Sequence, residues 1–129
     1  MAAQRWKAQV NENAKSPAFF SVQPEACHNE LAGWGQDGDV TRQVITLVTL
    51  RHGTEHPQVA RRFSLLEDDM LEIVADTIQV HTDATESIAQ FFDLAIFGDF
   101  VSLHLAGAEG VDPGPVPALA QMKDRLALS

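Results

Sequence analysis

The chain is short of cysteine and of cationic side chains. Cys27 is the single cysteine among 129 residues, so no disulfide can form within the chain. One free thiol is typical of a reducing compartment, and we expect a cytoplasmic protein. Lysine and arginine number 9 against 18 acidic residues, which gives a net charge of −9. That charge repels nucleic acid and anionic membranes, so we expect neither as a partner.

From the residue pattern we expect no signal peptide, no internal repeat and no membrane span. Its first residues, MAAQRWKAQ, contain no apolar segment of the signal-peptide kind. The most apolar run, FFDLAIFGDFVSLHLAGA, is interrupted by Asp93, Asp99 and His104. We therefore expect a buried helix of a soluble protein here. A hydrophobic content of 45% fits one globular domain.

Apolar spacing predicts helices alternating with short strands. The expected helices cover about residues 4–13, 57–74 and 85–107, with a turn over 28–34, a cap at Asp83 or Thr85 and a last helix holding Leu119, Met122 and Leu126. The expected strands are VITLVTL, residues 44–50, and residues 78–81, and GWGQDGD is expected to be a polar turn. This order predicts an α/β arrangement with parallel strands. Two strands make a thin sheet, so we expect a partner chain or further sequence to complete it.

Glu12 lies between two asparagines at the end of the first predicted helix. It could be a solvated glutamate between two amides that end the helix. Alternatively, Phe19 and Phe20 could shield it from water, and a carboxylate in such a place suits a general base that removes a proton beside a carbonyl.

His28 is followed by Asn29 and Glu30, which could orient its ring. Histidine titrates near neutral pH and is suited to proton transfer, although we expect most of the five histidines to be structural or exposed. Cys27 beside it raises a Cys–His nucleophile as an alternative, but adjacent side chains usually point apart.

Three further polar features need an interpretation. Lys123 lies at the edge of the last apolar stripe, either extending past the core into solvent or pointing into a site. Asp99 falls on an apolar helix face, where a carboxylate needs hydrogen-bond partners, so we expect a structural role.

His52 and His56 are four apart, but Gly53 and Pro57 disfavour a helix there, and we expect no metal or cofactor.

Five blocks of the sequence, in order, resemble the C-terminal sugar isomerase (SIS) domain of the bacterial and archaeal bifunctional phosphoglucose/phosphomannose isomerases: RWKAQVNENAKSPAF, PEACHNELAGW, EHPQVARRF, FGDFVSLHLA and GVDPGPVPALAQMKDRL. The resemblance implies a SIS-type (flavodoxin-like) parallel sheet flanked by helices and incomplete at its N-terminus. It also implies that residues 1–129 are the C-terminal SIS domain of a longer polypeptide with two SIS domains. Cys27 departs from the family, which more often has asparagine there.

The resemblance further implies an aldose–ketose isomerisation of glycolysis and gluconeogenesis, in which glucose 6-phosphate or mannose 6-phosphate interconverts with fructose 6-phosphate. By the same resemblance, Glu12 is the base that moves a proton between C2 and C1 through an enediolate. His28 would assist ring opening, reaching the site from the neighbouring subunit of a homodimer, and Lys123 would line the site.

The family's N-terminal SIS domain supplies a phosphate loop of serine and threonine and an arginine, none of which we find in this sequence. We therefore expect these residues alone to lack turnover. The alternatives are a non-catalytic SIS module that binds a sugar phosphate or a partner, and a purely structural dimerisation domain.

Overall fold

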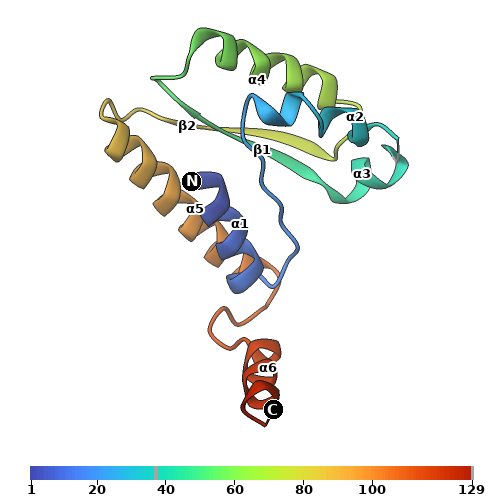
Figure 1. Ribbon diagram of the computed structural model, residues 1–129, viewed down its shortest axis with the longest axis vertical. Helices are drawn as coiled ribbons and strands as arrows, with labels where there is room; N and C mark the ends of the chain where they lie inside the picture. Colours follow the sequence, from blue (N-terminus) through green and yellow to red (C-terminus); the bar gives the residue numbers. More distant parts are fainter. Residues whose placement is uncertain (37, 129) are drawn as a thin grey trace.

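The computed structural model describes residues 1–36 and 38–128 (Figure 1). In chain order its elements are α1 (Ala2–Asn13), the 3-10 helix η1 (Glu25–Cys27), α2 (Leu31–Trp34), α3 (Gly38–Val44), β1 (Thr46–His52), α4 (Pro57–Met70), β2 (Asp76–Thr82), α5 (Ser87–Ala108) and α6 (Pro117–Ala127). In Figure 1 the strands lie between α4 on one side and α1 with α5 on the other, while α6 projects beyond them. The predicted α/β layers are confirmed.

The sheet of the described residues consists of β1 and β2, which pair in parallel from Thr46 opposite Asp76 to His52 opposite Thr82. Parallel pairing requires a crossover, and α4 supplies it. The first strand begins two residues later than predicted, because Val44 completes α3 instead. The thin parallel sheet expected from the sequence is therefore present, with strands slightly displaced or longer than predicted.

The side of β1 that faces α4 carries polar residues. Thr49 donates to Glu67 of α4, and the guanidinium of Arg51 lies 4.6 Å from the centre of the Phe63 ring. Arg51 also forms a buried ion pair with Glu55, at 2.8 Å. Burial opposes ionisation of Glu55, but hydrogen bonds from Arg51 and from the His52 amide outweigh it and lower the pKa of this carboxyl. These contacts fix the loop between β1 and α4.

The helical pair α1 and α5 is held together by Trp6. Its indole is buried and donates from Nε1 to the Leu94 carbonyl at 2.7 Å. The ring lies against Gly98, where an added Cβ would come within 2.2 Å of Nε1. A glycine is therefore needed at this crossing, because no other residue leaves room for the indole.

Several predicted boundaries are wrong. The long helix α5 begins after Glu86, with no side-chain cap, and neither Asp83 nor Thr85 caps it. Buried Gln90 instead donates to the Ala84 carbonyl and holds the loop before the helix. α4 ends at Met70 and not at residue 74.

The stretch predicted as a polar turn, residues 33–39, includes Asp37, which lies outside the described residues. Its last two residues, from Gly38, already belong to α3, a helix that the sequence analysis missed because glycines and aspartates at its start resemble a turn. Thr41 of α3 donates to the Ile73 carbonyl at 2.6 Å, so tertiary contact outweighs the poor local helix signal.

The prediction that α5 is a buried helix is correct for one face only. Within its most apolar window, 28% of the residues are buried inside the chain. Side chains such as Phe92, Ile96 and Phe100 are more than half exposed. By length and composition alone α5 could cross a membrane, a property shared by core helices of soluble proteins. The face that α1 covers is the packed one.

Candidate functional site

The Asn-Glu-Asn block forms the last turn of α1, and both asparagines are anchors. Asn11 donates from Nδ2 to the Ser16 carbonyl at 2.8 Å. Asn13 donates from Nδ2 to Ser102 Oγ of α5, also at 2.8 Å. Successive helical residues lie about 100° apart, so Glu12 projects from a different side than either amide. The helix end is therefore fixed on both flanks of Glu12.

The carboxylate of Glu12 is exposed, and within the described part of the chain no hydrogen bond or ion pair occupies it. The expectation that Phe19 and Phe20 keep water away is wrong for this chain alone, since these side chains are 87% and 44% exposed. The physical reason is helical phase: Trp6 and Asn13 make up the face turned to α5, and Glu12 lies off that face.

His28 follows η1 directly and is exposed. The prediction that Asn29 and Glu30 orient its ring is wrong, because both have other partners. Asn29 donates to Glu25 at 3.1 Å, and Glu30 accepts a hydrogen bond from Ser21. These contacts support the loop that carries the histidine, and among the described residues no hydrogen bond holds its ring.

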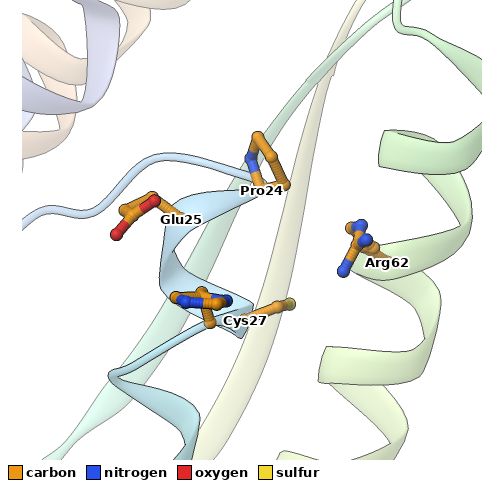
Figure 2. A pocket seen from close by; sticks show the side chains of 5 residues that line it. Pro24, Glu25, Cys27 and Arg62 are labelled. Carbon is orange, nitrogen blue, oxygen red and sulfur yellow. The ribbon is translucent and has the colours of Figure 1, made fainter.

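An open pocket of about 240 Å³ lies beside His28, lined by Pro24, Glu25, Cys27, His28 and Arg62. Figure 2 shows Cys27 of η1 and Arg62 of α4 directed into the space between the two helices. Sequence reasoning missed Arg62, because two adjacent arginines in α4 give no local sign of which one faces the loop. The pocket combines a histidine and a guanidinium, which suit an anionic ligand, with the carboxylate of Glu25, which does not.

Lys123 lies on α6, where none of the side chains is buried. Leu119, Met122 and Leu126 are between 49% and 67% exposed. In Figure 1 α6 lies at the end of the molecule opposite to η1. One copy of the chain therefore does not bring Lys123 together with His28.

Asp99 has the structural role expected of it, with a partner from far along the sequence. Arg5 of α1 donates from Nε and Nη2 to its carboxylate, the shorter contact being 2.7 Å. The hydrogen bond, followed by charge attraction, raises the pKa of the Arg5 guanidinium. The pair ties α1 to α5 near Trp6 and has no part in a reactive cluster. Among residues 1–36 and 38–128, no group of three or more His, Cys, Asp or Glu side chains is placed to hold a metal ion.

Comparison with a family model and with individual proteins relates this chain to the same group of proteins. The sequence matches the family model of the bacterial phospho-glucose isomerase C-terminal SIS domain over residues 1–126. It is 34% identical over 125 residues to a bifunctional phosphoglucose/phosphomannose isomerase of Caldicellulosiruptor bescii, which covers 97% of this chain and 37% of that protein. The corresponding protein of Aquifex aeolicus is 32% identical over 124 residues, 96% of this chain and 38% of that protein.

A shorter stretch of 29 residues is 69% identical to a D-glucosamine-6-phosphate 4-epimerase of Sulfolobus acidocaldarius, covering 22% of this chain and 10% of that protein. The chain thus spans less than two fifths of the length of the isomerases of Caldicellulosiruptor bescii and Aquifex aeolicus.

Proposed function

The chain belongs to the family of C-terminal SIS domains of bacterial phosphoglucose isomerases, and from this membership we propose that it forms part of an aldose–ketose isomerase of hexose 6-phosphates. Its substrates would be glucose 6-phosphate and mannose 6-phosphate, each interconverting with fructose 6-phosphate. These two aldoses differ only at C2, so one base and a planar enediolate intermediate can serve both.

The proposal rests on the way in which Glu12 is held in position. Asn11 and Asn13 hold the backbone on either side of it, while its carboxylate has no partner among the described residues. A general base needs this combination: a fixed position and a free oxygen within reach of the proton it removes. Glu12 would take the proton from C2 of the opened sugar and return it to C1.

His28 and Lys123 complete the proposed chemistry. His28 would transfer the proton that opens the sugar ring, and Lys123 would stabilise the negative charge of the enediolate. In the pocket beside His28, Arg62 supplies a local positive charge for an anionic substrate, beside the carboxylate of Glu25 and within a chain of net charge −9.

A complete site would need surfaces from outside this single chain. Glu12, His28 and Lys123 are all exposed here, and α6 lies far from η1 (Figure 1). We propose that an N-terminal SIS domain and a second copy of the chain cover them, so that water is excluded from the bound sugar. By this proposal the residues 1–129 alone have no turnover.

One observation favours a second candidate, a non-catalytic SIS module that binds a sugar phosphate: the three candidate residues are separately exposed. The short match to an epimerase, itself an enzyme, relates part of the sequence to a hexose phosphate and says nothing against catalysis. In this case the pocket at His28 and Arg62 would bind the phosphate, and Glu12 would be an ordinary surface residue.

The test is isomerisation of glucose 6-phosphate by the longest native polypeptide that contains these residues. Glu12→Gln should lower kcat by at least about a hundredfold, the usual loss when a general base is removed. The matched control is Glu72→Gln, an exposed glutamate in the turn after α4, which should keep wild-type turnover. Deuterium uptake at C2 from heavy water, followed by NMR, reports the proton transfer directly.

Full turnover and unchanged deuterium uptake in Glu12→Gln would exclude Glu12 as the base. An inactive wild-type polypeptide that still binds fructose 6-phosphate in calorimetry, with binding weakened by Arg62→Gln, would instead support the module.

A further inference from the structure

Lys15 has an unusual backbone for a residue with a side chain. It follows the end of α1 with a φ of 56°, and within the described residues it is the single non-glycine residue with a positive φ. The left-handed conformation disfavours any residue with a Cβ, and glycine or asparagine normally occupies this place after a helix. A lysine here indicates that its side chain contributes something that glycine could not.

The ammonium of Lys15 bridges two backbone carbonyls. It donates to the carbonyl oxygen of Glu12 at 2.6 Å and to that of Pro113 at 3.2 Å. The first is one of the carbonyls that a helix end leaves without an internal partner, and a cation there also interacts favourably with the helix dipole. The second lies in the linker between α5 and α6.

The backbone around Glu12 is thereby tied to three different segments. Asn11 reaches the chain just beyond the turn at Ser16, Asn13 reaches α5 at Ser102, and Lys15 reaches the linker at Pro113. The Lys15 tie is the one that extends toward α6, which carries Lys123. It is also the one that touches the peptide group of Glu12 itself.

We propose that Lys15 is a positioning residue for the Glu12 carboxylate, holding the peptide of the base against the linker that leads to Lys123. This inference rests on the proposed isomerase function. Lys15 does not touch the sugar; it acts by limiting the movement of Glu12, and reactions that depend on a near-attack geometry are sensitive to such movement.

The test uses the longest native polypeptide, three substitutions at Lys15 and one control. Lys15→Met removes the ammonium and should lower kcat about tenfold with little change in KM, because the base is displaced while substrate binding persists. Lys15→Gly relieves the backbone conformation but should lower kcat as much, whereas Lys15→Arg should restore most of it. Lys7→Met, on the same helix, is the matched control and should leave kcat unchanged.

A double-mutant comparison makes the role specific. In a Glu12→Gln background, Lys15→Met should cause no further loss, because the group it positions has gone. If Glu12→Gln abolishes turnover but Lys15→Met retains wild-type kcat, the inference about Lys15 is overturned while the proposed function stands.

If Glu12→Gln is fully active, Glu12 is not the base, and the positioning role of Lys15 fails with it, while the isomerase activity itself has been observed. Hydrogen exchange then reports the tie alone: the amide of Gly114, bonded to Asp112 in the linker, should exchange severalfold faster in Lys15→Met than in Lys7→Met. Equal exchange rates would show that Lys15 does not hold the linker.

Discussion

The helices α1 and α6 each carry a candidate catalytic residue, but they are held in very different ways. α1 lies along α5 with a buried indole, an ion pair and a side-chain hydrogen bond to Ser102. α6 follows a linker rich in glycine and proline and buries none of its residues. The position of Glu12 is therefore set within this chain, and that of Lys123 is not.

This difference indicates where the proposed reaction would depend on other surfaces. An isolated helix as short as α6, Pro117–Ala127, is marginal in water, and its stability comes from packing an apolar stripe. The stripe of Leu119, Met122 and Leu126 is exposed here. Glu12, the proposed base, is thus held in position within this chain, whereas no packed surface of the described residues holds Lys123.

The largest expected effect tests the α1–α5 contact. Gly98→Ala would place a methyl group 2.2 Å from Trp6 Nε1, so the indole must move and its hydrogen bond to Leu94 is lost. We expect the free energy of unfolding to fall by at least ~2 kcal/mol, measured by urea denaturation. Gly107→Ala is the matched control in the same helix, with no heavy atom within 4 Å of the added methyl.

The control should be neutral or slightly stabilising, by about 0.5 kcal/mol, because alanine favours a helix more than glycine does. Equal unfolding curves for the two variants would show that the close contact at Trp6 does not hold α1 in place, and the contrast with α6 would disappear.

Local sequence patterns were enough to predict most of the helices and strands, including α1 and α6. The spacing of Trp6 and Val10 predicted α1, and a run of β-branched residues predicted β1. Contacts between distant residues were not predictable. The partner of Asp99 is Arg5, 94 residues away, and nothing near Asp99 in the sequence indicates it.

The roles of the candidate site residues were harder to predict from the sequence alone. Glu12, His28 and Lys123 were assigned roles through resemblance, and composition by itself also fits ordinary surface residues. Their exposure could not be predicted, because it depends on which surfaces lie over them. The anchors Asn11 and Asn13 bond to serines 5 and 89 residues away, and only the fold shows that they leave the carboxylate of Glu12 free.

A smaller effect is expected at the ion pair between α1 and α5. The side chains of Arg5 and Asp99 are 49% and 29% exposed, so water and salt screen their attraction. Asp99→Asn should lower the Tm by roughly 3 °C at most, and the difference from wild type should shrink in 1 M salt. Asp124→Asn, on exposed α6, is the control and should leave the Tm unchanged. A Tm loss as large as that of Gly98→Ala would mean that the charge pair, and not the packing of Trp6, holds the two helices together.

The smallest effect is expected on α6. Leu119 is 49% exposed, so Leu119→Ala in the 129-residue chain should change the free energy of unfolding by no more than about 0.5 kcal/mol. Leu94→Ala, which removes a leucine only 5% exposed on α5, should cost at least ~2 kcal/mol in the same urea titration.

Repeating Leu119→Ala in the longest native polypeptide sharpens the comparison. If a partner surface covers α6 there, the same substitution becomes markedly more destabilising, because the leucine is then buried. A large loss already in the 129-residue chain would show that α6 packs against its own domain, and that Lys123, like Glu12, is positioned without help.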